Sequence, residues 1–130
     1  MIKALKLTMI IFGVIGILIG LSNIFIPEQV AKMYGFGEIA DYVRWMAGLA
    51  GVSYVAAGIW VIAAAKDPIY HINWVKFVIT KTLFFAVVTA YAIIKGYVSF
   101  SQVGPLLILF VIFAIAFLAF YPWRRARVSA

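Results

Sequence analysis

Four long apolar runs constrain the fold of this chain more than any other feature. They cover residues 5–26, 42–65, 74–94 and 103–120. A helix that crosses the hydrocarbon core of a membrane needs about 20 mostly apolar residues, and only helices or closed barrels can span that core. The sequence therefore predicts an all-α fold with a single membrane domain over residues 1–130, an integral membrane four-helix bundle.

The overall composition agrees with a lipid environment and argues against most kinds of chemistry. Of the 130 residues, 67% are hydrophobic and 12% are charged, whereas soluble domains are about half apolar and about a quarter charged. The chain has no cysteine and one histidine, His71, which excludes disulfides, thiolate metal sites and an intrachain pair of haem ligands. It also lacks a glycine-rich phosphate loop and a nucleophile elbow. We therefore expect no catalytic residues, no cofactor, no metal site and no enzymatic activity.

Charge is distributed unevenly along the chain and predicts its orientation. There are 11 Lys and Arg against 4 Asp and Glu, a net charge of +7. The basic residues cluster at the ends of the apolar runs, at Lys3, Lys6, Lys66, Lys76, Arg124, Arg125 and Arg127. By the positive-inside rule these residues place both termini in the cytoplasm, and an even number of spans likewise requires both termini on the same side. Their expected contacts are anionic lipid headgroups, and nucleic acid is not expected as a partner.

The first apolar run resembles a signal peptide in its basic start, Lys3 and Lys6. Its apolar core is longer than that of a signal peptide, and the residues that follow, SNIFIPEQ, contain no A-x-A cleavage site. We expect this run to be retained as a span.

A short helix is predicted directly after the first run. The segment PEQVAKMYGFG begins with Pro27, which favours the first position of a helix. Its apolar and polar residues separate onto two faces, as is typical of a helix that lies at the membrane interface. Gly35 and Gly37 then end the helix.

Glycines form stripes in the first two runs. In lipid, small residues allow helices to approach closely, and this close packing rather than apolar burial holds them together. The predicted packing residues are Gly13, Gly16, Gly20, Gly48, Gly51 and Gly58. They are expected to form a seam between the two helices or with a partner. The fourth run has no polar residue or glycine between Leu106 and Phe120. It is expected to be the most lipid-exposed span, or to pack against another apolar protein.

Lysine within the third run is the main candidate for a functional contact. Lys81 lies about 10 Å along the helix from Trp74, and a cation at the bilayer centre costs about 3 kcal/mol or more. No Asp or Glu lies within any of the four apolar runs. The ammonium group of Lys81 could reach the membrane interface by snorkelling. Alternatively, it could pair with Asp67, a lipid phosphate, a backbone carbonyl or an acid of another protein. Lys76 and Lys95 are further candidate contacts in this segment.

A second concentration of charge lies before and within the start of the second run. It consists of Glu38, Asp41 and Arg44. Asp41 and Arg44 are three residues apart on a helix and can form an ion pair. We expect a solvated charge cluster on the outer side of the membrane.

Two segments carry a resemblance to a known group. They are NIFIPEQVAKMYG and VRWMAGLAGVSYVAAGIWVIAAAKDP. The chain resembles the DoxX-like small membrane proteins of bacteria and archaea. That resemblance implies a compact four-helix bundle in the cytoplasmic membrane of a prokaryote, often without an assigned activity, and some relatives are attached to respiratory or oxidoreductase assemblies. The absence of cysteine argues against thiol chemistry here, and the resemblance identifies no functional residue.

Three functional hypotheses follow. The first is a non-catalytic accessory or structural subunit of a larger membrane complex, with other membrane subunits or copies of itself as partners. The second is a small oligomeric transporter or channel, in which Lys81 and Lys95 would favour anions. The third is a binder of a lipophilic small molecule, which requires converging polar groups. The candidate groups for the third are Ser53, Tyr54, Thr80, Thr82 and Thr89.

Overall fold

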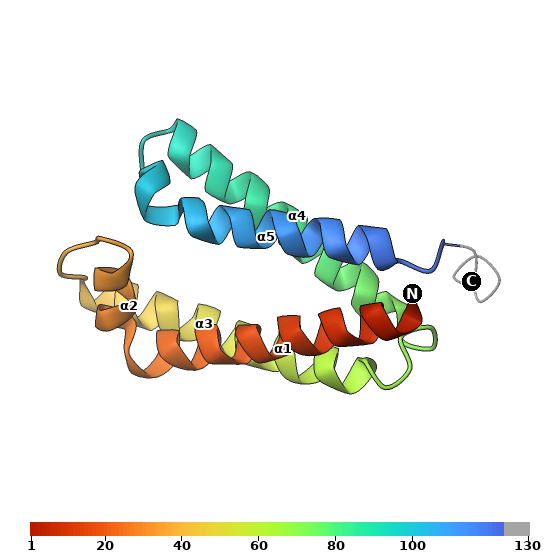
Figure 1. Cartoon of the computed structure of the whole chain (residues 1–130). Coiled ribbons are helices and arrows are strands. Elements are labelled where there is room, and N and C mark those ends of the chain that lie inside the picture. The colour runs from red at the N-terminus through yellow and green to blue at the C-terminus, as the bar shows by residue number, and fades with distance from the viewer. Residues whose placement is uncertain (124–130) are drawn as a thin grey trace. The chain divides into compact units, whose positions relative to one another are not determined.

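The structure is a computed structural model that describes residues 1–123, and most of this part of the chain is helical. The helices are α1 (Ile2–Phe25), α2 (Pro27–Met33), α3 (Asp41–Ala64), α4 (Ile72–Ile94) and α5 (Phe100–Phe120) (Figure 1). Residues 1–123 contain no strand, so the predicted all-α class is confirmed. The basic residues predicted at the C-terminus, Arg124, Arg125 and Arg127, lie outside the described residues.

Four of these helices are long and apolar enough to cross a membrane. The helices α1, α3, α4 and α5 contain 24, 24, 23 and 21 residues. At about 1.5 Å per residue each exceeds the hydrocarbon thickness of about 30 Å. Their bounds lie within three residues of the predicted runs, and α2 is the short helix predicted after the first of them. The chain is thus built as an integral membrane protein.

The chain divides into two compact units. One unit spans Ile10–Ala63 and contains most of α1, all of α2 and nearly all of α3. The other combines Met1–Met9 with the chain from Ala64 onward, and therefore contains α4 and α5. Each unit is held together by a different kind of helix contact.

In the first unit, α1 and α3 run antiparallel and meet at glycines. A Cβ atom on Gly20 would lie 2.5 Å from the carbonyl oxygen of Gly51, and one on Gly58 would lie 2.7 Å from the carbonyl oxygen of Gly13. Real Cβ atoms essentially never approach so closely. The predicted seam is therefore a contact within the chain, and it depends on backbone meeting backbone. Gly16 belongs to the same side, at an ordinary contact distance from α3.

Gly48, which the sequence analysis grouped with the other glycines, is not part of the seam between α1 and α3. A Cβ atom there would meet nothing within 4 Å. At about 100° per residue, Gly51 and Gly58 share a stripe to within about 20°, whereas Gly48 lies about 60° away from Gly51. The offset turns Gly48 away from the close approach of the two backbones.

In the second unit, α4 and α5 contact each other through large side chains. The rings of Phe85 and Phe110 lie side by side, with centroids 5.2 Å apart. Val78 and Thr82 on α4 and Phe117 on α5 are buried. The hydroxyl of Thr82 donates to the carbonyl oxygen of Val78 at 2.9 Å, so its burial leaves no polar group unsatisfied.

The prediction that the fourth run is the most lipid-exposed span is wrong. In the most apolar 18-residue stretch of α5, 33% of the residues are buried. The same share is 22% in α1 and in α3, and 11% in α4. Phe110, Phe113 and Phe117 recur at helical spacing and form one buried face. The uniform hydropathy of the run concealed that face, and α4 is the least buried span.

The connections end the helices by recognisable means. Gly35 after α2 and Gly96 after α4 adopt positive φ angles of 79° and 76°, which favour glycine. A capping box starts α5: the Ser99 hydroxyl accepts from the backbone N–H of Gln102, whose side-chain oxygen accepts from the N–H of Ser99. These features mark the end of α2, the end of α4 and the start of α5.

Candidate functional site

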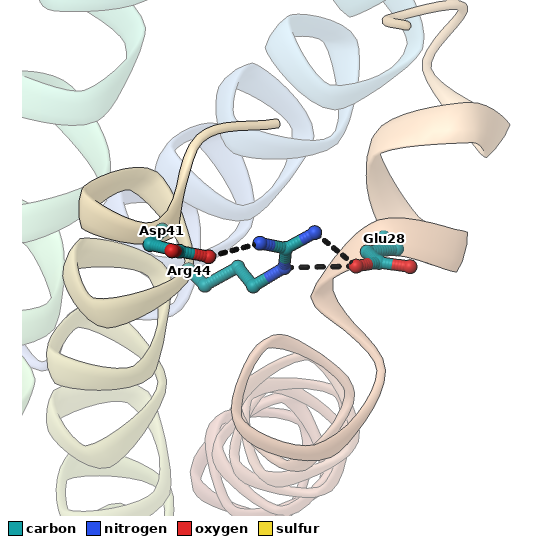
Figure 2. Close-up of polar contacts among 3 residues, drawn as sticks. All are labelled: Glu28, Asp41 and Arg44. Carbon is teal, nitrogen blue, oxygen red and sulfur yellow. Dashed lines mark hydrogen bonds and ion pairs between the residues drawn. The ribbon is translucent and has the colours of Figure 1, made fainter. Parts of the chain in front are cut away.

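Arg44 is the centre of a charge cluster that connects two helices of the first unit. It lies in the first turn of α3, and its Nε donates to Oε1 of Glu28 on α2 at 2.8 Å. Nη2 contacts the same oxygen, and Nη1 pairs with Asp41 of its own helix. Figure 2 shows the guanidinium lying between the two carboxylates. The arrangement fastens α2 to the start of α3.

The cluster contains an acid that sequence reasoning placed elsewhere. Asp41 and Arg44 pair as expected, but Glu28, 16 residues before Arg44, takes the second position. Within residues 1–123, Glu38 is not among the acids that Arg44 contacts. The available signal was topological: an antiparallel α3 begins where α1 ends, and Glu28 is in the first turn of the helix that follows α1.

The short helix α2 also packs against the rest of the first unit through its apolar side. Ala31 is buried and Tyr34, at the end of the helix, is half-buried, whereas Met33 on the other side is exposed. Burial raises the pKa of the Tyr34 phenol above its usual value of 10.0. The helix is thus attached by apolar contact as well as by the Glu28–Arg44 pair.

Lys81 lies in α4 close to the aromatic contact with α5. Its side chain is partly buried, and Nζ lies 5.6 Å from the centroid of the Phe85 ring. That distance is within the range of a cation–π interaction. Phe85 in turn contacts Phe110. The ammonium group is therefore held beside the aromatic pair that joins the two helices.

The other two candidate lysines lie nearer the ends of α4. Lys76 is exposed in its second turn. Lys95 caps its C-terminal end, and its Nζ lies 5.8 Å from the Tyr91 ring centroid. Asp67, the acid considered as a partner for Lys81, accepts from the backbone N–H of Tyr70 at 3.1 Å. These positions distinguish one partly buried cation from two exposed ones on the same helix.

Most hydroxyl groups considered for binding a lipophilic molecule are engaged in their own helices. Each donates to the carbonyl oxygen four residues earlier, as Ser and Thr do in membrane helices. The donors are Ser53, Thr80, Thr82 and Thr89, at distances of 3.2, 3.0, 2.9 and 2.7 Å. This pattern satisfies the hydroxyl groups locally and gives no convergent polar site.

The fold and these side chains define a class: a small integral membrane protein with four potential spans, a salt-bridged short helix and a partly buried lysine, Lys81, within a span. Residues 1–123 contain no cluster of three or more His, Cys, Asp or Glu side chains able to hold a metal ion. No family model, no curated protein and no solved structure matches the chain. The resemblance to the DoxX-like group therefore rests on the sequence segments quoted above.

Proposed function

We propose that the protein is a non-catalytic accessory subunit of a larger membrane complex, and that α4 is the helix that contacts the other subunits. The observation that carries the proposal is the position of Lys81. It lies nine residues into α4, about 14 Å along a helix of about 35 Å. A cation at such a depth is costly in lipid, which makes an acid on a neighbouring helix a favourable partner.

The surface around Lys81 suits a neighbouring transmembrane helix. Phe84, Val88 and Tyr91 are 68%, 63% and 53% exposed and fall on the same side of α4 as Lys81, counting about 100° per residue. Large side chains on the least buried span offer area for packing, and the lysine adds a charge that selects the partner. The expected occupant is a span with a Glu or Asp at matching depth, from a different chain of the complex.

Extraction of the tagged protein from its native membranes in a mild detergent tests this proposal. After size separation, mass spectrometry should find foreign subunits in stoichiometric amounts. We expect Lys81→Met to reduce their recovery about tenfold or more, Lys81→Arg to retain most of it, and Lys76→Met to have no effect. Lys76 is the matched control because it lies on the same helix but about 140° away from Lys81.

Purification of a single species would contradict the accessory role. A homo-oligomer would favour the second hypothesis, a transporter or channel for anions, since Lys81 and Lys95 lie on the same side of α4. In that case, Lys81→Leu should slow anion flux into liposomes that contain the purified protein. Recovery of foreign subunits with wild type and Lys81→Met alike would exclude Lys81 as the contact.

We also propose that both termini lie in the cytoplasm of a prokaryotic cell, since Lys3, Lys6 and Lys66 flank the spans on one side. The absence of cysteine makes a test simple, because each introduced thiol is unique. An impermeant thiol reagent added to intact cells should label Glu38→Cys and should not label Lys66→Cys. Labelling of Lys66→Cys alone would reverse the orientation.

A further inference from the structure

The side chain of Lys81 extends away from the nearer end of its helix. Lys81 is closer to the end of α4 at Ile72 than to the other end, and a snorkelling lysine extends toward the nearer interface. Helical side chains also lean toward the N-terminal end, which here is the same end. The Nζ atom nevertheless lies over the ring of Phe85, 5.6 Å from its centroid. Phe85 is one turn, about 6 Å, farther from Ile72 than Lys81 is.

Attraction between the ammonium group and the ring accounts for this direction. The face of a phenylalanine ring is negative and attracts a cation within about 6 Å of its centroid, more strongly where water is excluded. The ring is fixed in turn by α5, because it packs against Phe110 with centroids 5.2 Å apart, and Phe110 is buried. Lys81 thus supplies the charge, Phe85 sets its depth and Phe110 holds Phe85.

The depth matters because Lys81 and Phe85 lie on either side of residue 83, the midpoint of α4. An ion pair is stronger there than at the interface, where water screens it. We propose that Phe85 is a positioning residue, whose ring keeps the Lys81 ammonium group near the middle of the span for the acid of a neighbouring subunit. This proposal rests on the contact between Lys81 and another subunit proposed above. It places the acid of that subunit near the middle of its own span.

The depth of the ammonium group can be measured in the full-length chain without a partner. The chain carries isotope-labelled lysine in lipid nanodiscs, and a water-soluble paramagnetic chelate broadens the NMR signals of side chains that approach water. The Lys81 signal is the one that Lys81→Met removes. We expect Phe85→Leu to increase its broadening about threefold, the population change that an ordinary cation–π interaction supports. Phe77→Leu, one turn from Lys81 on the other side, is the matched control and should leave the signal unchanged.

Recovery of foreign subunits from native membranes tests the role of that depth. We expect Phe85→Leu to lower recovery about threefold, and Phe85→Tyr, which keeps an aromatic ring, to preserve it. Trifluorophenylalanine at position 85 keeps a ring beside Phe110 but withdraws the negative charge from its face, so it should act like leucine. In a Lys81→Met background, Phe85→Leu should lower recovery no further, because Phe85 acts through Lys81.

The outcomes separate this proposal from the proposed function. An unchanged Lys81 signal in Phe85→Leu would overturn it, as would full recovery of subunits with trifluorophenylalanine at position 85. A further loss in the double variant would also overturn it, since Phe85 would then act independently of the lysine. Full recovery with Lys81→Met would contradict the proposed contact itself. The variant that keeps its subunits therefore shows which of the two proposals has failed.

Discussion

The two units of this protein hold their helices together in opposite ways. Between α1 and α3 the backbones approach so closely that Gly20 and Gly51 have no room for a Cβ atom. Between α4 and α5 the contact is made by rings such as Phe85 and Phe110, 5.2 Å apart. One contact depends on missing side chains and the other on large ones.

The difference shows which substitutions each contact tolerates. Lipid solvates the apolar side chains of separated helices, so packing two helices together removes no apolar surface from water. The stability of the packed state therefore comes from close contact between the helices. A glycine seam already has its contacts at minimum distance and fails when an atom is added. An aromatic contact fills its space with side-chain atoms and fails when they are removed.

Removal of a ring from α5 should have the largest effect. Phe117 is 0% exposed, and Phe117→Ala leaves a cavity that its neighbours fill only in part. We expect a loss of about 3 kcal/mol in the free energy of unfolding, the low end of the range for Phe→Ala, because lipid removes most of the transfer term. Unfolding by a denaturing detergent measures it. Ile115→Ala, at a 61% exposed position on the same helix, is the control and should change little. Similar losses for both variants would show that α5 is not held through its aromatic face.

A methyl group added to the glycine seam should have the next largest effect. A Cβ atom on Gly51 would lie 2.5 Å from the carbonyl oxygen of Gly20, so Gly51→Ala should push α1 and α3 apart and cost about 2 kcal/mol. Gly48→Ala is the matched control, since it makes the same change on the same helix in open space. It should be neutral or slightly stabilising because alanine favours helix. If both variants unfold alike, the close approach of the two backbones is not what holds this unit.

The helices themselves could be predicted from sequence because lipid leaves a spanning chain few alternatives. Apolar length predicted each span to within three residues, and Pro27 marked the start of the short helix. Glycine spacing predicted a packing seam, although the sequence left open whether the helix packed against these glycines belongs to this chain or to a partner.

Side-chain contacts between helices were less predictable, for specific reasons. The three phenylalanines of the α5 face are surrounded by residues that are also apolar, so the buried side of α5 was not visible in its sequence. Gly48 looked equivalent to Gly51, yet an offset of about 60° on the helix removes it from the seam. Glu28 replaced Glu38 beside Arg44 because the fold, rather than distance along the chain, brings α2 to α3.

The ion pair between α2 and α3 tests whether the first unit needs more than its glycine seam. Glu28→Gln removes the charge that accepts two hydrogen bonds from Arg44. Both side chains are partly exposed, at 48% and 39%, so we expect only a small change in overall stability. The effect should be local: faster amide hydrogen exchange in Pro27–Met33, with α1 and α3 unchanged. Glu38→Gln is the control. Equal exchange in wild type and Glu28→Gln would show that apolar contact alone holds α2.

Tyr34 gives the smallest and most local test of that apolar contact. Because burial raises its pKa above 10.0, the folded state keeps the phenol proton at a pH where the unfolded chain has begun to lose it. The stabilising contribution is therefore complete below pH 10 and is lost as the pH rises through the higher pKa of the folded protein. Unfolding measured from neutral pH to above pH 10 should show a decline in stability that Tyr34→Phe makes shallower. The lysines contribute to both curves, so the difference between them isolates Tyr34. Curves that decline in parallel would mean that the phenol is as accessible in the folded protein as in the unfolded one, and that Tyr34 does not attach α2 to the first unit.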